Sequence, residues 1–593
     1  MCGIEGFNFS DRTAISRMIK LQNHRGPDAH GSFVDDNVSI GNNRLSVIDL
    51  SKKGKQPMCN EDGSIWIVFN GEIYNFQPLR EELIKTGHRF SSASDTEVLV
   101  HGYEEWGESL AEKLNGMWAF AIYDSRKKIL FMSRDRFGKK PFFYYYKNGT
   151  LIFASEIKAI LSHKTVEREI NQTALEFYIG LSWIPEPLTI YKYIYKLPKS
   201  SYAIFDLKCK KFKKIKKYFS VPNYKQKIHD KKFIIEETRK LIDDSVRLRM
   251  MADVPVGSFL SGGLDSSTIT ATMIKTIGGS DNLHTFSIGF DGKYDESRYA
   301  LSMADLLETN HHHEYFEKKD FEKLMNKIYF YYDEPFVDPS IYPTYKVSEL
   351  ARRFVTVSLS GDGADELFGG YGHYVNYRRL NVMKKFPSAM KVIGKIFFDK
   401  TYRATNSKYA LKFLQDFSTI LDDKHVPNPT SKNMNMLEKM KSSKAGMLDK
   451  ALDFDINFTL VDGYLVKVDR ASMANSLEVR CPFLDYRLVK FSQKIPSKYK
   501  VSLYGTKVLF RKIISDRVPK NITGRKKKMG FTPPVIDWLE KDYKSIAEEK
   551  LGELKKTGIV NGKTIDKSLI SANKQEMFNL FSLRLWQEKW AEK

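Results

Sequence analysis

The fold of this chain is decided by the stretch Ser258-Phe-Leu-Ser-Gly-Gly-Leu-Asp-Ser-Ser-Thr268. An apolar lead-in meets two adjacent glycines, and a helix-like run follows from Asp265. Adjacent glycines let the backbone approach an anion closely, and the start of a helix adds a favourable dipole. Asp265 repels phosphate unless a cation lies between the two, so the stretch predicts a phosphate-binding loop that works with Mg²⁺. A glycine turn followed by an Asp cap is the alternative explanation.

Strand and helix patterns alternate on both sides of this loop. Strands are predicted at 254–260, 284–290, 312–316 and 354–359, and helices at 233–250, 266–277, 297–308 and 321–332. This order predicts a doubly wound parallel sheet, with ligands at the carboxyl ends of its strands. The glycine-rich loops 261–263 and 360–363 each follow a strand, so we expect them at the same edge of the sheet. Residues 375–593 are predicted to be mainly helical additions.

The first 205 residues or so have a different pattern. Short strands separated by Gly, Asn and Asp turns are predicted at 64–69, 119–123, 129–134, 142–146 and 151–154, with helices at 79–86 and 96–106. We expect layered antiparallel sheets with flanking helices. Residues 206–230 are basic and poorly periodic, and we interpret them as a linker. The predicted domains are therefore 2–205 and 231–593.

Length and composition set further limits. A chain of 593 residues with 42% hydrophobic residues supports two or more domains. No uninterrupted apolar stretch reaches about 18 residues and the N-terminus lacks a signal-peptide pattern, so we predict no membrane association. The cysteines Cys2, Cys59, Cys209 and Cys481 form no Cys-x-x-Cys pair. This argues against a disulfide framework or a zinc site and favours the cytoplasm.

The net charge of +23 raises the hypothesis of nucleic-acid binding. The lysines are scattered, however, and their densest runs are 208–217 and 525–528. The first run alternates with apolar residues, which is typical of an exposed strand or a linker. We therefore interpret the charge as a solvated surface and predict no nucleic-acid partner. A nucleic-acid-binding protein built on a degenerate enzyme scaffold is the competing hypothesis.

Cys2 directly follows the initiator methionine. Removal of Met1 would leave a free α-amine beside the thiol, and that amine can act as general base for its own side chain. A small residue that merely permits methionine cleavage is the alternative. Further motifs follow: Asn23-His-Arg-Gly-Pro-Asp28, Arg44-Leu-Ser46, Gln56-Pro-Met58, Asn70-Gly-Glu-Ile-Tyr-Asn75 and Ser94-Asp-Thr-Glu97. With them, the N-terminal region resembles the class II glutamine amidotransferase domain, which implies an αββα sandwich of the N-terminal-nucleophile hydrolase type.

The resemblance implies a role for each motif. Cys2 would attack the glutamine side-chain amide, while Asn70 and the Gly71 amide would form the oxyanion hole. A zwitterionic amino acid needs a guanidinium and carboxylates in fixed places. The implied glutamine-binding residues are Arg44, Leu45, Val47, Asn70, Glu72 and Asp95. Taken singly, a hairpin turn at Asn70-Gly71 and a surface charge at Arg44 are the alternative explanations.

Two residues near these motifs need separate interpretation. Asn42 stands where the family usually has a histidine, two residues before the arginine, and this departure affects only local packing or hydrogen bonding. His24 is expected to be a structural hydrogen-bonding residue rather than a catalytic one.

The second domain resembles the synthetase half of glutamine-hydrolysing asparagine synthetases, which implies an ATP-pyrophosphatase fold. The matching blocks are 261–267, Thr285-Phe-Ser-Ile-Gly289, His312-His-Glu314, Asp333-Glu-Pro-Phe336, 360–371, 465–474, Ser476-Leu-Glu-Val-Arg480, Pro482-Phe-Leu-Asp485, and Lys507 with Arg511. One departure is Val461-Asp-Gly463, where Pro-Asp-Asp is more usual. The two resemblances together span nearly the whole chain.

Attack of a carboxylate on the α-phosphate of ATP needs the anions shielded and aligned. Asp265 and Asp365 are the candidate Mg²⁺ ligands, and Lys507 would neutralise charge on the α-phosphate and the departing pyrophosphate. By resemblance, Asp362 would take a proton from the attacking amine. The implied ATP-binding residues are Leu260, Ser261, Gly262, Gly263, Asp265, Ser266, Ser267, Ile288, Ser360 and Gly361. The triplet 311–313 is all histidine, but neighbouring strand residues point to opposite faces, so we expect structural roles rather than one metal site.

Together the two halves predict a cytoplasmic amidotransferase that uses glutamine, aspartate and ATP with Mg²⁺, and that forms a homodimer. Glutamine hydrolysis would release ammonia, which would attack a β-aspartyl-AMP and give asparagine, AMP and pyrophosphate. The closest alternative keeps both half-reactions and amidates a different carboxylate, such as a polysaccharide precursor or a metabolite. The acceptor pocket is expected in the 330–345 loop or in the lysine-rich helical middle near 375–450.

Overall fold

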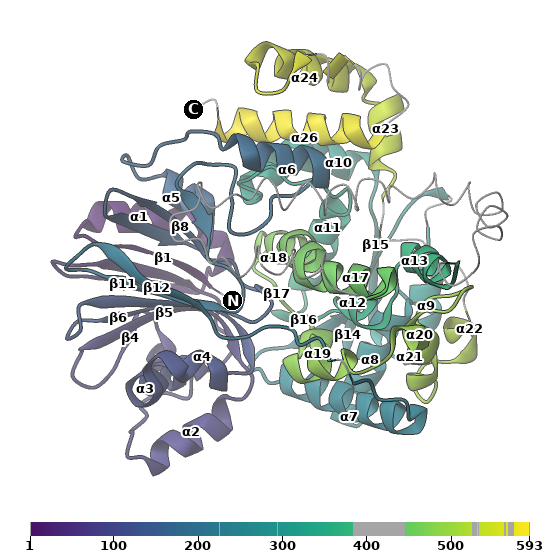
Figure 1. The fold of residues 1–593 in the computed structure, drawn as a ribbon, viewed down its shortest axis with the longest axis horizontal. Coiled ribbons are helices and arrows are strands. Elements are labelled where there is room, and N and C mark those ends of the chain that lie inside the picture. Colours follow the sequence, from purple (N-terminus) through teal and green to yellow (C-terminus); the bar gives the residue numbers. More distant parts are fainter. Residues whose placement is uncertain are drawn as a thin grey trace.

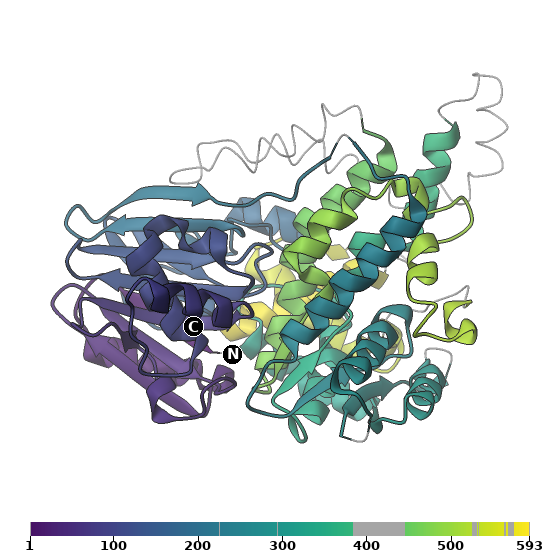
Figure 2. The ribbon, with the colours of Figure 1, turned by 90° about the horizontal axis from the view of Figure 1, so that it is seen from below.

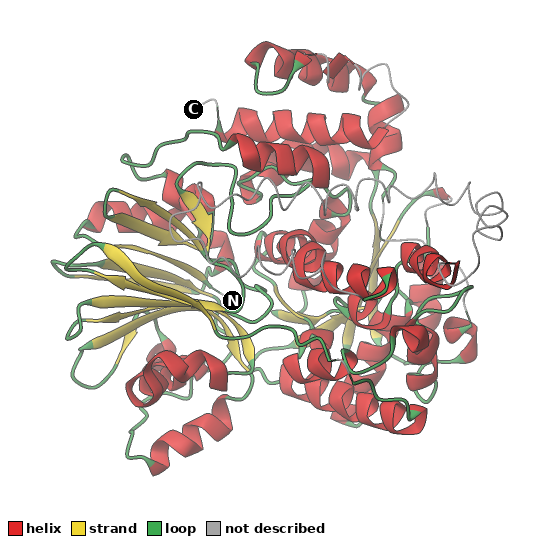
Figure 3. Ribbon diagram, viewed as in Figure 1, coloured by secondary structure: helices red, strands yellow, loops and turns green. Residues whose placement is uncertain are grey.

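The structure is a computed structural model, and it describes residues 2–224, 226–280, 282–292, 295–383, 445–524, 531, 533–562, 565–566 and 574–591. A pair of layered sheets makes up the N-terminal part, and a domain rich in helices makes up the rest (Figures 1 and 3). The start of the chain lies between these two parts in both views (Figures 1 and 2). Residues near the N-terminus are therefore held at the domain boundary.

Two six-stranded antiparallel sheets form the N-terminal domain, in the orders β10-β8-β9-β1-β3-β2 and β12-β11-β7-β6-β5-β4. Their strands are β1 (Gly3–Phe7), β2 (Ala29–Val34), β3 (Ser39–Arg44), β4 (Met58–Cys59), β5 (Ile65–Ile73), β6 (Gly116–Asp124), β7 (Ile129–Arg134), β8 (Phe143–Lys147), β9 (Thr150–Ala154), β10 (Ile194–Lys196), β11 (Ser201–Asp206) and β12 (Lys211–Lys217). Alternation of inward and outward side chains along these strands lets each sheet bury both of its faces.

Small and branched apolar side chains fill the space between the two sheets, among them Ile4, Ile40, Val68, Ala121 and Met132. Helices α1 and α5 cover the outer face of the first sheet, and α2 and α3 cover that of the second. The helices of this domain are α1 (Arg12–Leu21), α2 (Phe76–Lys85), α3 (Asp95–Trp106), α4 (Leu110–Lys113), α5 (Ile157–Leu161) and α6 (Gln172–Leu181). The predicted αββα sandwich is therefore confirmed.

A five-stranded sheet in the order β15-β14-β13-β16-β17 forms the centre of the second domain, and all its pairings are parallel. Its strands are β13 (Val256–Phe259), β14 (His284–Gly289), β15 (Asn310–Tyr315), β16 (Val357–Leu359) and β17 (Glu478–Arg480). Ser258 of β13 is aligned with both Thr285 of β14 and Leu359 of β16. The predicted parallel sheet is confirmed, and the carboxyl ends of β13 and β16 lie side by side.

Helices make up the rest of this domain (Figure 3). They are α7 (Lys231–Arg249), α8 (Leu264–Ile277), α9 (Ser297–Leu306), α10 (Lys318–Tyr331), α11 (Ile341–Arg352), α12 (Ala364–Phe368), α13 (Gly372–Met383), α17 (Met447–Phe454), a π-helical segment (Asp455–Tyr464), α18 (Leu465–Met473), α19 (Tyr486–Ser492), α20 (Ser497–Lys500), α21 (Val508–Ile513), α22 (Lys520–Thr523), α23 (Val535–Lys541), α24 (Lys544–Thr557) and α26 (Lys574–Trp590). No helix in the described part of the chain is both long and apolar enough to cross a bilayer.

Two elements of this domain were not predicted from the sequence. Strand β17 is only three residues long and follows β16 at a great distance in the sequence, so no local pattern reveals it. Helix α11 contains Pro343 in its first turn. A proline there leaves the helix intact, because the first turn has no intrahelical partner for the missing N–H.

The region 206–230, interpreted as a linker, begins with a strand of the sandwich. Strand β12 pairs with β11, with Ala203 opposite Ile215 and Phe205 opposite Phe212. Its lysines alternate with half-buried apolar side chains, as expected for the exposed-strand alternative. Lysines on an edge strand hinder pairing with other chains. The second basic run, 525–528, lies outside the described residues.

Buried polar contacts join the two domains. Arg25 of the sandwich pairs with Asp469 of α18 at 3.0 Å, and both side chains are almost fully buried. Asp462, in the departure at 461–463, accepts a hydrogen bond from the backbone N–H of Glu186 at 3.1 Å. A buried charge that lost its partner would be strongly destabilising, so these pairs fix how the domains meet.

Candidate active sites

The first site surrounds Cys2, which precedes β1 and is almost fully buried. Its backbone N–H donates to the side-chain oxygen of Asn70 at 3.1 Å, and its carbonyl accepts from Arg25 Nε at 3.2 Å. Burial raises the pKa of the Cys2 thiol, while a backbone hydrogen bond from Leu45 and the charge of Arg44 oppose this shift. The thiol therefore needs a base before it can act as a nucleophile.

Asn70 and Gly71 lie inside strand β5 and pair with β6, so they do not form a hairpin turn. Asn70 is fully buried next to Cys2. A Cβ atom at Gly71 would lie 2.1 Å from the carbonyl oxygen of Met117, so only glycine fits there. The strand thus places a buried side-chain amide beside Cys2.

Arg44 ends strand β3 and is buried, which excludes a surface charge. Its guanidinium donates to the carbonyl oxygens of Ile48 at 3.0 Å, Asp49 at 2.6 Å and Ser51 at 3.3 Å. These bonds use three of its five N–H groups and leave two for a ligand.

The loop after Arg44 also contacts the second domain. The carbonyl oxygen of Val47 accepts from the backbone N–H of Asp253 at 2.8 Å. The side chains of Leu45 and Val47 are buried in a hydrophobic cluster that includes Val246 of α7. Their backbone groups, rather than their side chains, are therefore available to the Cys2 site.

Two buried carboxylates, Glu72 of β5 and Asp95 at the start of α3, interact with each other. Asp95 accepts from the Ile73 backbone at 2.9 Å, and Glu72 accepts from Arg480 at 3.2 Å. Burial is the main cause that raises both pKa values, to about 6 for Asp95, and the charge of Asp95 raises that of Glu72 further. Burial disfavours the ionised form of these two carboxyl groups, and a cation bound between them would favour it.

Asn42 and His24 make structural contacts near this site. The amide nitrogen of Asn42 donates to the carbonyl oxygens of Gly3 at 3.1 Å and Phe69 at 3.3 Å. His24 Nε2 lies 3.2 Å from a carboxylate oxygen of Glu156, and burial is the main cause that lowers its pKa. His24 therefore makes the hydrogen-bonding contact expected of it, and Asn42 links neighbouring strands.

The second site begins at the loop between β13 and α8. The backbone N–H of Ser261 donates to the hydroxyl of Ser266 at 3.2 Å, and the two hydroxyl oxygens lie 3.0 Å apart. Gly262 has a φ of +67°, and a Cβ there would lie 2.2 Å from the backbone of Tyr299. The first turn of α8 follows at once, and the start of a helix favours a bound anion.

The loop after β16 packs directly against the first loop. A Cβ at Gly361 would lie 2.8 Å from the Cβ of Asp265. The hydroxyl of Ser360 donates to a carboxylate oxygen of Asp362 at 2.7 Å. Both loops line one cavity, so they lie at the same edge of the sheet, as expected.

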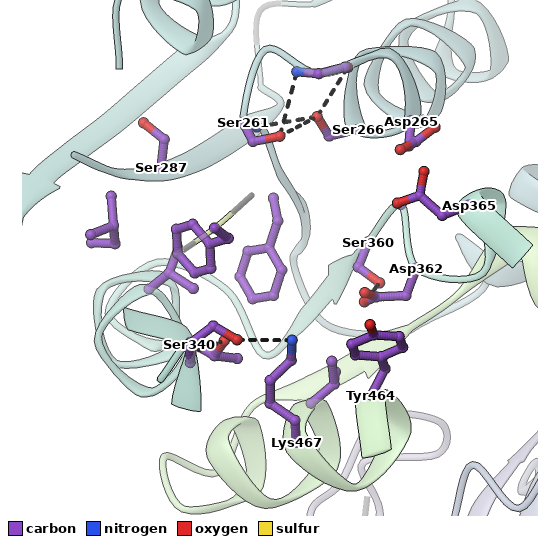
Figure 4. A pocket seen from close by; sticks show the side chains of 18 of the residues that line it. Ser261, Asp265, Ser266, Ser287, Ser340, Ser360, Asp362, Asp365, Tyr464 and Lys467 are labelled. Atoms are coloured by element: carbon purple, nitrogen blue, oxygen red, sulfur yellow. Dashed lines mark hydrogen bonds between the residues drawn. The ribbon is translucent and has the colours of Figure 1, made fainter. Parts of the chain in front are cut away.

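The carboxylates of Asp265 and Asp365 come from these two loops and face each other (Figure 4). The Lys507 ammonium lies 2.5 Å from a carboxylate oxygen of each. A Cβ at Gly370 would lie 1.6 Å from Asp365, so the backbone must approach this cluster closely. Two carboxylates and a buried lysine thus form one charged cluster beside the phosphate loop.

The cavity between these loops has a volume of about 670 Å³, which fits a small-molecule ligand. Gly262 and Ser267 are not among its lining residues, because Gly262 forms the turn and Ser267 is fully buried. Lys507 is also absent from the lining and contacts Asp265 and Asp365 instead. The predicted residues that line the cavity are Leu260, Ser261, Gly263, Asp265, Ser266, Ile288, Ser360, Gly361, Asp362 and Asp365.

The cavity also contains side chains for which no role was predicted. Lys467 of α18 and Ser340 lie across it from the phosphate loop (Figure 4). Glu366 accepts a hydrogen bond from the Tyr371 hydroxyl at 2.6 Å, and burial raises its pKa to about 8. Lys467 is the one charged residue in the apolar run 465–468, and this exception was the sequence signal that could have marked it as a site residue. Of the two expected acceptor regions, 330–345 contributes to this cavity, while 384–444 lies outside the described residues.

Strand β17 contacts both sites. Arg480 pairs with Glu72 of the Cys2 site at 3.2 Å. The next residue, Cys481, has its sulfur 3.5 Å from the Ser360 hydroxyl of the second site. The sequence did not predict this link, because 408 positions separate Arg480 from Glu72.

The histidines of β15 point to opposite faces of the sheet, as expected. His311 and His313 each lie 2.8 Å from the hydroxyl of Ser287 on one face. His312 stacks on His284 on the other face. One metal ion could therefore not bind all three.

Comparison with known proteins shows the family of both domains. The family model described as "Asparagine synthase" matches residues 237–591, and the model "Glutamine amidotransferase domain" matches residues 1–219. The solved glutamine phosphoribosylpyrophosphate amidotransferase of Bacillus subtilis matches with 17% identity over 47% of this chain and 64% of its own, at a TM-score of 0.28.

Several relatives match over most of the chain. A Methanocaldococcus jannaschii protein is 43% identical over 80% of this chain and 98% of its own length. Asparagine synthetase [glutamine-hydrolyzing] 1 of Bacillus subtilis is 35% identical over 91% of this chain and 88% of its own length. Asparagine synthetase [glutamine-hydrolyzing] 3 of that organism is 34% identical over 91% and 89%. The chain therefore belongs to the asparagine synthase family and carries an N-terminal glutamine amidotransferase domain.

Proposed function

We propose that this chain makes asparagine from aspartate, with glutamine as nitrogen donor and ATP as the activating co-substrate. The observation that carries the proposal is the presence of both sites in one structure: Cys2 beside Asn70 in the sandwich, and the paired loops with Asp265, Asp365 and Lys507 in the second domain. The first site releases ammonia and the second makes a carboxylate reactive toward it.

At the first site, removal of Met1 frees the α-amine of Cys2, which takes the proton of the buried thiol. The thiolate attacks the side-chain amide carbon of glutamine, and Asn70 with the Gly71 amide stabilises the oxyanion. Ammonia leaves, and water then hydrolyses the thioester to glutamate. Arg44 holds the α-carboxylate of glutamine, and Glu72 and Asp95 hold its α-ammonium.

The carboxylate pair predicts a pH dependence. The pKa of Asp95 is raised to about 6, so Asp95 binds a proton below that pH. The protonated carboxyl group attracts the α-ammonium of glutamine less strongly than the carboxylate does. We expect kcat/KM for glutamine in the glutaminase reaction to rise as pH increases through about 6. Asp95→Asn should raise KM for glutamine about 10- to 100-fold and remove this step, because one charged hydrogen-bond partner is lost.

The pH dependence of folding stability runs in the opposite direction to that of kcat/KM for glutamine. A carboxyl group with a raised pKa in the folded state makes folding less favourable as pH rises above its ordinary pKa. Asp95→Asn should therefore not lower the melting temperature at neutral pH. Ammonia-dependent synthesis by the same variant serves as control, and a loss of that activity as well would contradict a role limited to glutamine binding.

At the second site, the β-carboxylate of aspartate attacks the α-phosphorus of ATP, and pyrophosphate leaves. Lys507 balances the charge that develops on the phosphates. The carboxylates of Asp265 and Asp365 both contact the Lys507 ammonium, so their oxygens already converge on one positive charge. Two carboxylates in such an arrangement fit the oxygen ligands that Mg²⁺ prefers. When bound, Mg²⁺ supplies further shielding of the phosphates.

Ammonia then attacks the carbonyl carbon of β-aspartyl-AMP and forms a C–N bond, while the acyl C–O bond breaks and AMP leaves with its electron pair. Asp362, whose carboxylate is oriented by Ser360, takes the proton that the nitrogen loses. Ammonia reaches this site through the domain interface, because bulk water would protonate it and remove its nucleophilicity.

The proposal is tested by assaying the purified protein for pyrophosphate and amide formation with glutamine, ATP, Mg²⁺ and a panel of carboxylates. Aspartate should give asparagine with one pyrophosphate per amide. Turnover of a different acid without turnover of aspartate would contradict the choice of acceptor. Omission of Mg²⁺ should stop synthesis but leave glutaminase activity. A cytoplasmic location and a homodimer remain predictions, which fractionation and sedimentation would test.

A further inference from the structure

A charged group lies on the wall of the ATP-site cavity across from the phosphate loop (Figure 4). The Lys467 ammonium donates to a carboxylate oxygen of Asp338 at 3.1 Å and to the hydroxyl of Ser340 at 3.0 Å. Asp338 and Ser340 lie in the loop before α11, and Lys467 lies in the first turn of α18. All three residues line the cavity.

Lys467 is the one Lys or Arg side chain among the described residues that line this cavity. Six other lining side chains carry carboxyl groups: Asp265, Glu296, Asp338, Asp362, Asp365 and Glu366. An acceptor such as aspartate brings two carboxylates into this acidic surrounding. Only its reacting carboxylate approaches the phosphate loops, so its second carboxylate needs a separate cation.

The pair is held in place on both sides. Asp338 accepts hydrogen bonds from the backbone N–H of Ser340 at 2.8 Å and from its hydroxyl at 2.6 Å. The Tyr332 hydroxyl donates to the carbonyl oxygen of Lys467 at 2.8 Å. Burial opposes ionisation of Asp338, but Lys467 and Ser340 outweigh it, so its pKa is lowered. The pair is thus a preorganised cation and anion, side by side.

A ligand can still reach both groups, because Lys467 is 14% exposed and Asp338 is 24% exposed. An ion pair of this kind is complementary to a zwitterion, in which a carboxylate and an ammonium are carried by one carbon. The matched arrangement lets each charge of the ligand meet an opposite charge without leaving any protein charge unpaired.

We propose that Lys467 and Asp338 bind the α-amino acid group of the acceptor, with the α-carboxylate on Lys467 and the α-ammonium on Asp338. The inference rests on the proposed function and adds the part of the pocket that selects an amino acid. Polysaccharide precursors and simple dicarboxylates lack one or both of these groups, so the pair would disfavour them. The side chain of aspartate is then directed toward the loops that carry Asp265 and Ser360.

Two analogues of aspartate separate the two contacts. β-Alanine keeps the ammonium and the reacting carboxylate but lacks the α-carboxylate, while succinate lacks the ammonium. Each is measured as a competitive inhibitor against aspartate in ammonia-dependent pyrophosphate release, so neither needs to be turned over. In the parent protein, both should bind about 10- to 100-fold more weakly than aspartate, because each loses one charge-assisted contact.

Lys467→Met should raise KM for aspartate about 10- to 100-fold and change the inhibition constant of β-alanine by less than about threefold. Asp338→Asn should raise KM for aspartate similarly and leave succinate unchanged. KM for ATP and the glutaminase activity should stay near parent values in both variants. Lys467→Arg, which keeps the charge, should restore most of the affinity for aspartate.

Lys346→Met is the matched control. Lys346 has similar exposure, at 18%, and pairs with Asp320 at 3.3 Å, but it does not line the cavity. This variant should leave every constant near that of the parent.

The outcomes separate the inference from the proposed function. If the parent protein releases no pyrophosphate with aspartate, the proposed function itself is wrong. If the parent is active and Lys467→Met leaves KM for aspartate unchanged, the zwitterion site is wrong. Equal weakening of aspartate and both analogues would identify a merely structural ion pair, and a selective rise in KM for ATP would assign the lysine to the nucleotide; either result overturns the inference.

Discussion

Cys2→Ala should abolish glutamine-dependent asparagine synthesis and glutaminase activity while ammonia-dependent synthesis continues. The thiol is the only group at this site that can form the thioester, so we expect at least about a 1,000-fold loss with glutamine. Alanine also permits removal of Met1, so the α-amine and its surroundings are kept. With saturating ammonia, synthesis should stay within about threefold of the parent, because the second site is unchanged.

Cys59→Ala provides the control, because Cys59 is an exposed cysteine in the same domain. It should leave both activities intact. The measurement is asparagine and glutamate formation with glutamine or ammonium salt as nitrogen source. Glutamine-dependent synthesis that survives in Cys2→Ala would show that Cys2 is not the nucleophile.

Asp265→Asn should have the opposite pattern, with synthesis lost and glutaminase retained. Asp265 belongs to the charged cluster with Asp365 and Lys507, and loss of its charge leaves the lysine held by one carboxylate only. The anionic oxygen ligand for Mg²⁺ would be lost as well. We expect pyrophosphate release to fall about 100- to 1,000-fold with either nitrogen source, as for loss of one preorganised electrostatic group.

Asp243→Asn is the matched control for this charge change. Asp243 of α7 also lies between two cations, Lys275 and Arg517, but it does not line the cavity. Arg517 keeps its second partner, Asp516, in this variant, so both activities should persist. Full synthesis by Asp265→Asn would contradict its place in the second site, whereas loss of glutaminase would indicate a folding defect.

Local sequence patterns predicted most of the framework. The alternation in 284–290 and the run after Gly263 are short-range signals, and the structure has β14 and α8 there. The order of strand and helix was enough to place the loops after β13 and β16 at one edge, because right-handed crossovers leave few other arrangements. Strand β12 shows the limit, since an alternating lysine run fits both a linker and an edge strand.

Contacts between distant segments could not be predicted in this way. Asn70-Gly71 is a typical turn dipeptide, yet the neighbouring strands of the sandwich hold it inside β5. Lys467 and Asp338 are 129 positions apart, and no local pattern in either segment indicates that the two side chains meet. The same is true of Arg480 and Glu72, whose pairing depends on how the two domains pack.

The sequence by itself determined the chemistry at both ends of the reaction: a cysteine at position 2, the loop from Ser258 to Thr268 and the blocks that identify the family. These are local properties, because residue type and spacing set which groups a short segment can offer. The tertiary structure decided which groups meet. It brought Asp265, Asp365 and Lys507 together and set Lys467 opposite the phosphate loop. Only burial and packing across the whole chain fix such distances, because the free energy that holds them comes from the folded domains and not from the segments.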